Sequence, residues 1–365
     1  MDRLANRRRE WSGRCIVARA VMEPLELRRL LAHFAVIGDF SSDVATAPTR
    51  DVANLVKSWS PDFVATVGDN NYPDGSASTI DDNIGQWYHA FIGNYQGSYG
   101  GGASPNKFWP AIGNHDYNSS QGYKPYTDYF TLPNNERYYT TVQGNVQLFI
   151  VNSDSHESNG TSQNSTQGQW LKNALASSSA QWKLVLFHHP AYSSGSIGSN
   201  SYMQWPFQQW GASAVISGHD HDYERIDKGG FPYFVDGLGG ESIVGFGRTV
   251  SGSQVRYNDD YGAMLIDTSS SAMTFKFINR SGQTIDSFAL GSTSSAPSAP
   301  SGLNVSAIAS TQAKLTWTDN SPSLSASFKI ERSLDNGATF SPLTTTLAGV
   351  TSYTDQGLAP GATYV

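Results

Sequence analysis

The stretch SGHDHDYER (Ser217–Arg225) follows directly on the apolar run Ala212–Ile216, which is typical of a buried strand. In an extended chain, residues two apart point to the same side. His219 and His221 therefore face one way, while Asp220 between them points elsewhere. The pattern predicts that both histidines contribute to one site at the end of this strand.

Four other apolar runs end in residues that bind metals or phosphate. They are HFAVIGD, PDFVATVGD, KFWPAIGNHD and WKLVLFHHP, and a further apolar run, QLFIVNSD, lies between the last two. The carboxyl ends of strands in an open α/β sheet converge on one edge, so we expect these residues to meet there. The set comprises Asp39, Asp69, Tyr72, Asn114, His115, His188, His219 and His221.

This set mixes carboxylate, phenol, amide oxygen and imidazole, and it contains no thiolate. Such a mixture suits Fe, Zn or Mn. It also offers too many ligands for one ion, and two ions about 3.5–4 Å apart need a shared carboxylate. Asp69, in the middle of the chain order, is the natural candidate for the bridge.

Composition and charge exclude several classes of protein. The single cysteine, Cys15, rules out an intrachain disulfide. The net charge is −7; residues 1–31 carry eight arginines and four acids, which is +4, so the remainder carries −11. An acidic body argues against nucleic-acid binding through a basic face. No apolar run reaches the length of a membrane span.

The chain divides into segments by texture. Residues 1–32 form an N-terminal segment in which MEPLELRRLLA (Met22–Ala32) resembles a motif of exported and surface proteins of some bacteria; the alternatives are an ordinary amphipathic helix and a misassigned start. An α/β domain covers 33–290, with helices predicted at Asp51–Ser58 and in STQGQWLKNALASS, where Ser165 or Thr166 is the N-cap. After Asp222, short strands predict an antiparallel sheet that closes the domain.

The Gly/Ser/Pro-rich segment 291–302 is a linker by composition, and residues 303–365 resemble an incomplete fibronectin type III domain. Trp317 stands where that family keeps a core tryptophan. The last two strands of such a β-sandwich are missing, which would leave an unpaired edge. We interpret the chain as a fragment of a longer protein or as the product of a truncated gene.

The ordered blocks GDF, GDNNY, GNHD, FHHP and GHDH resemble the calcineurin-like metallophosphoesterases, and Tyr72 with GHDHDYER is most similar to the purple acid phosphatase branch. The resemblance implies a four-layer α/β/β/α sandwich. It also implies that Asp39, Tyr72 and His221 hold one metal, typically Fe(III). Asn114, His188 and His219 would hold a divalent ion (Zn, Fe or Mn), and Asp69 would bridge the two.

The same resemblance implies two catalytic residues. His115 would sit over the metals as proton donor or phosphate contact, and Asp116 would brace it. One departure concerns the loop Ala191–Trp205, where purple acid phosphatases usually carry further histidines; it contains none. The second acid/base group is therefore unassigned. We interpret His189 as structural, and we expect Glu224 and Arg225 to pair behind the site.

These features favour a secreted or cell-surface two-metal phosphoesterase that hydrolyses small phosphomonoesters with a metal-bound hydroxide. A phosphodiesterase or nucleotidase on the same core is the first alternative. A non-catalytic surface adhesion protein, which contacts a cell surface or matrix through the fibronectin-like module, is the second.

Overall fold

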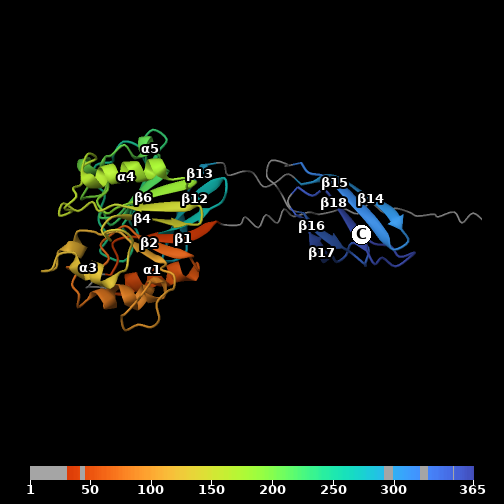
Figure 1. Cartoon of the computed structure of the whole chain (residues 1–365), viewed down its shortest axis with the longest axis horizontal. Helices are drawn as coiled ribbons and strands as arrows, with labels where there is room; N and C mark the ends of the chain where they lie inside the picture. The colour runs from red at the N-terminus through yellow and green to blue at the C-terminus, as the bar shows by residue number, and fades with distance from the viewer. Residues whose placement is uncertain (1–30, 42–45, 292–298, 321–327, 348) are drawn as a thin grey trace, which may run out of the picture. The chain divides into compact units, whose positions relative to one another are not determined.

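The computed structural model describes residues 31–41, 46–291, 299–320, 328–347 and 349–365. Contacts divide the chain into two compact units (Figure 1). One spans Leu30–Thr293 and contains all the predicted site residues; the other contains Ser294–Val365. Most of the predicted export motif and most of the predicted linker lie outside the described residues.

Two sheets build the larger unit. The first has six strands in the order β13-β12-β11-β1-β2-β3, and the second has seven in the order β10-β8-β9-β7-β6-β5-β4. The first consists of β1 (Ala32–Ile37), β2 (Phe63–Thr66), β3 (Phe108–Pro110), β11 (Gly262–Thr268), β12 (Ala272–Asn279) and β13 (Thr284–Gly291). The second consists of β4 (Tyr139–Gln143), β5 (Val146–Ile150), β6 (Trp182–Leu186), β7 (Ala214–Ser217), β8 (Tyr223–Asp227), β9 (Pro232–Asp236) and β10 (Ser253–Tyr257).

Helices cover the outer side of each sheet, so the layers run helix, sheet, sheet, helix, as the resemblance implied (Figure 1). In that view α4 and α5 lie along the second sheet, and α1 and α3 lie along the first. The α-helices are α1 (Thr46–Ser58), α2 (Gln86–Tyr88), α3 (Lys124–Tyr129), α4 (Thr166–Ser177) and α5 (Phe207–Trp210), and shorter helical turns occupy Asp81–Gly85, His89–Phe91, His115–Tyr117 and Ser201–Met203.

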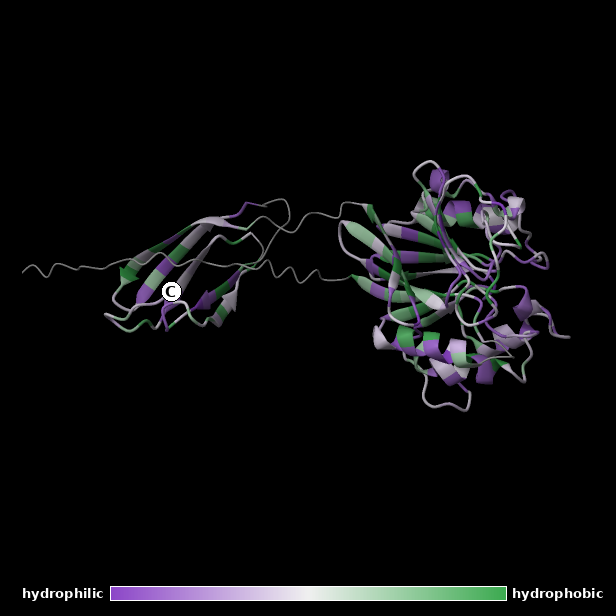
Figure 2. Cartoon of the chain, turned by 180° about the vertical axis from the view of Figure 1, so that it is seen from behind, coloured by the Kyte–Doolittle hydropathy of each residue, from purple (hydrophilic) through white to green (hydrophobic). Residues whose placement is uncertain are grey.

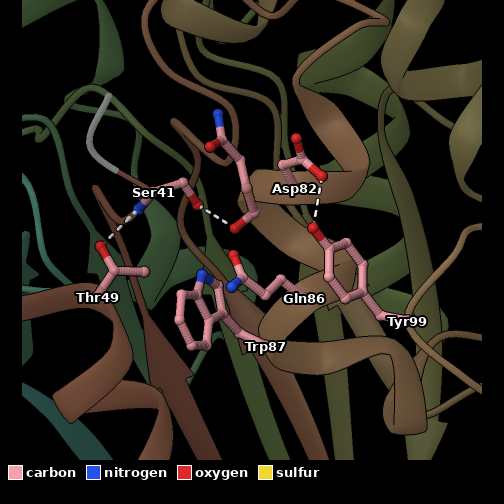
Figure 3. Close-up of a pocket in the computed structure, with 7 residues that line it drawn as sticks. Ser41, Thr49, Asp82, Gln86, Trp87 and Tyr99 are labelled. Atoms are coloured by element: carbon pink, nitrogen blue, oxygen red, sulfur yellow. Dashed lines mark hydrogen bonds between the residues drawn. The ribbon is translucent and has the colours of Figure 1, made fainter. Parts of the chain in front are cut away.

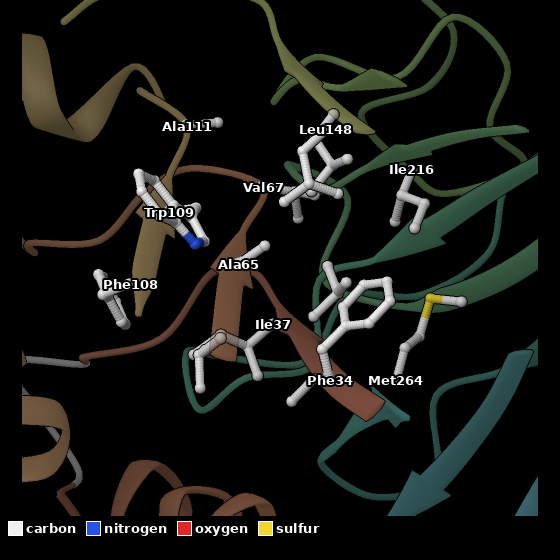
Figure 4. Close-up of a cluster of buried hydrophobic side chains, with 14 of the residues drawn as sticks. Phe34, Ile37, Ala65, Val67, Phe108, Trp109, Ala111, Leu148, Ile216 and Met264 are labelled. Atoms are coloured by element: carbon white, nitrogen blue, oxygen red, sulfur yellow. The ribbon is translucent and has the colours of Figure 1, made fainter. Parts of the chain in front are cut away.

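The second sheet is apolar on both faces. Neighbouring residues of a strand point to opposite faces, and in its central strands the residues at both positions are apolar. Leu184 and Ile216 join the core between the sheets, whereas Val185 and Val215 join the core under α4 and α5. Figure 4 shows Phe34 from β1 in the same cluster as Leu148 and Ile216 from the second sheet. Strands buried on both faces read as continuous apolar runs. Figure 2 shows this as green strands between more polar helices.

Two expectations about local structure need correction, and one is confirmed. Helix α1 begins at Thr46, not at Asp51. The strands after Asp222 do not form one closing sheet: β9 pairs with β7 in the second sheet, and β11 pairs with β1 in the first. Helix α4 has Ser165, one of the two predicted candidates, as its N-cap, and the Ser165 side chain accepts a hydrogen bond from the Gly168 N–H.

The described residues of the smaller unit form five strands in two antiparallel sheets. Trp317 is buried there with Phe328 and Ile330, so its predicted place in a core is confirmed. The likeness to a fibronectin type III domain stays a prediction. The strands are β14 (Ser301–Ala309), β15 (Gln312–Thr318) and β18 (Ser352–Gln356) in one sheet, and β16 (Lys329–Arg332) and β17 (Ser341–Thr345) in the other. Among the described residues of the whole chain, no helix is long and apolar enough to cross a membrane.

The core between the sheets predicts that alanine substitutions at two strand positions of the second sheet differ in their effect on the free energy of unfolding. Leu184→Ala should lower the free energy of unfolding by about 2–5 kcal/mol because it leaves a cavity where no solvent reaches. Val142→Ala, on β4 with 59% of the side chain exposed, should change it by less than about 0.5 kcal/mol. Urea unfolding of both variants in chelator measures this, and similar losses would contradict the proposed packing.

Candidate metal centre

The predicted ligands come together at the carboxyl ends of strands from both sheets. From the first sheet, Asp39 follows β1, Asp69 follows β2 and Asn114 follows β3. From the second sheet, His188 follows β6, and His219 and His221 follow β7. The sheets meet so closely that the backbone N–H of His219 donates to both carboxylate oxygens of Asp39, at 2.9 and 3.1 Å. Residues 180 positions apart therefore share one site.

Tight turns after the strands direct these side chains inward. Asp39, Asp69 and His219 have left-handed backbones, with φ of 54°, 49° and 71°. Gly68, just before Asp69, has φ of 101°, and a Cβ there would lie 2.8 Å from the His188 ring. Only glycine allows strand β2 to end so close to a neighbouring ligand. The steric limit at Gly68 therefore explains why a glycine precedes Asp69.

Asp39, Tyr72 and His221 form the first half-site. The Tyr72 hydroxyl lies 3.2 Å from His221 Nε2 and 3.5 Å from Asp39 Oδ1, and His221 Nε2 lies 3.4 Å from the same carboxylate oxygen. The other ring nitrogen of His221 is bonded to the Ser242 carbonyl at 2.6 Å. That hydrogen bond turns Nε2 toward the site.

Asn114, His188 and His219 form the second half-site. His188 Nε2 lies 3.0 Å from Asn114 Oδ1 and 3.1 Å from His219 Nδ1. Its Nδ1 is bonded to the Val67 carbonyl at 3.0 Å, which leaves the Nε2 lone pair for a ligand.

Asp69 joins the two half-sites. Its Oδ2 lies 3.0 Å from the Tyr72 hydroxyl and 3.1 Å from His188 Nε2, while Oδ1 accepts the His115 backbone N–H at 2.8 Å. Asp69, His188 and His219 each offer a donor atom within 4.8 Å of the others, as residues that hold one ion must.

The site is rich in negative charge and contains no fixed cation. Among the described residues, no lysine or arginine forms an ion pair with Asp39 or Asp69. Burial would lower the pKa of His188, but the charges of Asp69 and Asp39 raise it to about 9. Burial would also lower the pKa of His221, but the hydrogen bond and the charge of Asp39 raise it to about 9. Without a metal, two protons supply the positive charge.

The remaining pKa values fit the same arrangement. Burial, followed by the charge of His188, lowers the pKa of His219 to about 3. Burial would raise the pKa of Asp69, but the charge and hydrogen bond of His188 keep it below its ordinary value. Burial and the charges of Asp69 and Asp39 raise the pKa of the Tyr72 phenol well above 10. A phenolate here therefore requires a strong cation beside it.

Oxygen and nitrogen lone pairs thus converge in two triads around a shared carboxylate, with no lysine or arginine paired to that carboxylate in the described chain. This donor set fits two metal ions of the Fe, Zn or Mn type.

His115 lies beside the first half-site, but its bracing partner differs from the one expected. Its ring packs 4.3 Å from the Tyr72 ring, and its Nδ1 is bonded to the Pro73 carbonyl at 2.6 Å. The Asp116 carboxylate instead accepts hydrogen bonds from Gly113 N–H and from the backbone and side chain of Asn70. Asp116 therefore ties the turns after β2 and β3 together, and the backbone carbonyl of Pro73 orients His115.

The loop Ala191–Trp205 is held by two carboxylates, Asp220 and Glu224, that sequence reasoning did not connect with this loop. Asp220 accepts from the N–H groups of Ile197 and Gly198 at 2.8 and 2.9 Å. Glu224 accepts from both the N–H and the hydroxyl of Ser194. The expected Glu224–Arg225 pair is wrong, because Arg225 pairs with Asp286 of β13. The alternation of Ser217–Arg225 could have signalled this second row of side chains.

His189 turns away from the first half-site and packs against the second. Its Nδ1 lies 3.0 Å from the Ser153 hydroxyl, and its ring is 4.4 Å from that of His219. Burial and the charges of His188 and His219 lower its pKa to about 2, so the ring is neutral. These contacts agree with a structural interpretation of His189.

A family model for the calcineurin-like phosphoesterases matches residues 32–223. The chain belongs to this family. Two uncharacterised proteins of Mycobacterium tuberculosis, MT2654 and Rv2577, are 26% identical over 216 residues. The match covers 52% of this chain and 39% of theirs, so the chain spans about two fifths of the length of these relatives.

Other relatives of the phosphoesterase family extend the comparison. Human tartrate-resistant acid phosphatase type 5 is 23% identical over 295 residues, which cover 69% of this chain and 89% of that protein. Purple acid phosphatase PPD1 from yellow lupin seeds shares the fold, with a TM-score of 0.57, 20% identity and coverage of 71% and 53%. GAP50, described as the anchor in the inner membrane complex of Plasmodium, shares it equally, with a TM-score of 0.56, 18% identity and coverage of 71% and 88%.

The bridging position of Asp69 predicts a defined metal defect. Asp69→Asn should bind at most one metal ion per chain, whereas the parent protein should bind two, because one oxygen of this side chain contacts both half-sites. Asp154→Asn is the matched control: it is also a buried aspartate beyond a strand end, and it pairs with His156 outside the half-sites. Metal analysis after dialysis measures this, and two ions bound to Asp69→Asn would refute the bridge.

Proposed function

We propose that the chain is a two-metal phosphoesterase of the purple acid phosphatase type that hydrolyses small phosphomonoesters. The observation that carries the proposal is that Asp69 Oδ2 contacts the phenol of one half-site and an imidazole of the other at 3.0 and 3.1 Å. Family membership supports phosphoester hydrolysis in general. The presence of Tyr72 in the ligand cluster supports the narrower assignment.

Ligand charge supports a different metal in each half-site. The first half-site has two groups that become anionic, the Asp39 carboxylate and the Tyr72 phenol. The second offers an amide oxygen and two imidazoles, which are neutral ligands. We therefore assign Fe(III) to the first and a divalent ion (Zn, Fe or Mn) to the second. When bound, the two ions supply the Lewis acidity and activated water of this reaction class.

His115 is suited to proton transfer to the leaving group. The Pro73 carbonyl occupies its Nδ1, so Nε2 is the nitrogen left to carry a proton toward substrate. Packing of its ring against Tyr72 holds the imidazole over the first half-site. Its backbone N–H also binds Asp69, so the turn that carries the acid is tied to the carboxylate shared by the two half-sites.

A diesterase or nucleotidase is the second candidate, and the composition of the Ala191–Trp205 loop favours a phosphodiester over a phosphomonoester as the substrate. That loop brings no imidazole to the cleft, so it adds no cation to bind the second charge of a monoester dianion. A phosphodiester carries only one charge. Rates with p-nitrophenyl phosphate and bis-p-nitrophenyl phosphate decide between the two enzymes.

We also propose that the protein is exported to the cell surface or medium, on the resemblance of Met22–Ala32. Most of that motif lies outside the described residues. The fibronectin-like unit would then mediate contact with a surface or matrix.

Tyr72→Phe should remove the visible absorption expected of the iron-loaded protein, because a phenolate on Fe(III) is the group that absorbs there. Tyr88→Phe is the control, since Tyr88 is a buried tyrosine on α2 that is not one of the predicted ligands. Absorption spectra with metal analysis of the same samples measure this. A colourless parent protein with two zinc or manganese ions would disprove the ferric assignment while keeping the two-metal hydrolase.

His115→Asn should slow hydrolysis in proportion to how much the leaving group needs a proton. With an alkyl phosphate the loss in kcat should be about 10²–10³-fold, and with p-nitrophenyl phosphate it should be less than about tenfold. His156→Asn, at an imidazole paired with Asp154, is the control and should leave both rates unchanged. Equal losses with both substrates would exclude His115 as the proton donor.

A further inference from the structure

A cavity lies close to the turn that carries Tyr72, because its lining residue Asn83 donates to the Tyr72 carbonyl, and none of the predicted ligands lines it. It has a volume of about 260 Å³. Figure 3 shows its walls, which come from the turn after β1, the start of α1, the helical segment that leads into α2, and the loop near Tyr99. The lining residues are Ser41, Thr49, Asp82, Asn83, Gln86, Trp87 and Tyr99.

Several polar groups in this cavity are available to a ligand. Among the described residues, no hydrogen bond involves the Gln86 side-chain amide or the Trp87 indole N–H. Asp82 uses one carboxylate oxygen to accept from the Tyr99 hydroxyl at 2.6 Å, and its other oxygen is available. The amide both donates and accepts, the indole donates and the carboxylate accepts. The cavity can therefore satisfy hydroxyl groups in both of their roles.

The frame of the cavity is held by internal hydrogen bonds. Ser41 donates through its hydroxyl to the Asn83 carbonyl at 2.7 Å and through its N–H to the Thr49 hydroxyl at 3.2 Å. Both N–H groups of the Asn83 side-chain amide are used, because they donate to the Tyr72 carbonyl and to the Asn71 side chain. The walls are therefore set before a ligand arrives, which reduces the entropy lost on binding.

Charge restricts the ligand. Within the part of the chain that the structure describes, Asp82 is the only charged residue in the lining, so this lining carries one negative charge and no lysine or arginine. It would repel a phosphate or a carboxylate. The phosphate group of a substrate therefore belongs at the metals, and the ligand of this cavity is not an anion.

Aromatic surface gives the cavity a shape preference. Figure 3 shows the Trp87 indole and the Tyr99 ring on either side of the Gln86 amide. Trp87 is half-buried against the core, and Tyr99 is fixed by Asp82, so both rings are held in place. The negative face of an aromatic ring attracts polarised C–H groups, such as those on one side of a pyranose ring.

We propose that this cavity binds a neutral pyranose, either as a free monosaccharide or as the terminal sugar of a glycan. The ring stacks on Trp87, and its hydroxyls bond to Gln86, Asp82 and the indole N–H. This proposal does not rest on phosphoester hydrolysis, because no metal ligand lines the cavity.

The test is ligand-observed NMR with the full, metal-loaded chain and a panel of methyl pyranosides, followed by short oligosaccharides that end in the preferred sugar. Saturable binding of at least one pyranoside is expected. Equal affinity for the monosaccharide and the oligosaccharide identifies a free sugar as sufficient. Tighter binding of the oligosaccharide identifies a glycan terminus.

Variants assign any binding to this cavity. Trp87→Ala should weaken it by about tenfold and Gln86→Ala by about three- to tenfold. Gln86 is exposed, so its variant keeps the fold even if Trp87→Ala does not. Gln208→Ala, at an exposed glutamine on α5, is the matched control and should bind as the parent does. Three results would overturn the proposal. The first is that no pyranoside shows saturable binding, and the second is that Gln86→Ala leaves the binding unaffected. The third is that choline, a cation added to the panel for comparison, is the one ligand with saturable binding.

Discussion

One carboxylate oxygen, Asp69 Oδ2, contacts groups from both halves of the candidate metal centre, and the rest of the site depends on that contact. The carboxylate can reach Tyr72 and His188 together only if β2 of the first sheet ends opposite β6 of the second. The apolar core between the sheets enforces this alignment. Docking of the two sheets therefore determines whether the site exists, because neither sheet carries a complete set of ligands.

The segment Ser217–Arg225 shows how one short extended stretch serves two purposes. His219 and His221 face the ligand cluster, while Asp220 and Glu224 bind backbone N–H groups of the Ala191–Trp205 loop. Burial and the neighbouring charges of Asp220 and Glu224 raise the pKa of Asp222 to about 8, so it adds little charge at neutral pH. Because successive side chains point to opposite sides, one set of residues in this segment faces the candidate metal ligands and the other set supports the loop that forms the cleft wall.

Much of the site was predictable because each candidate ligand follows an apolar run, and strand ends converge. The number of sheets was not predictable in the same way, since a strand buried on both faces reads alike in any sheet. The partner of His115 was missed because the Pro73 carbonyl that holds it has no side-chain signature. The family resemblance implied that Asp116 braces His115, whereas its contacts are to the backbone of Gly113 and to Asn70.

The left-handed backbones at Asp39, Asp69 and His219 have a consequence for how this domain can change over evolutionary time. Each such conformation is held at a cost of about 1–3 kcal/mol, which a glycine would avoid. Drift toward greater stability would therefore remove these side chains first. At these three positions the residue that favours stability differs from the residue that the site needs. Selection for stability alone would therefore replace the site's side chains.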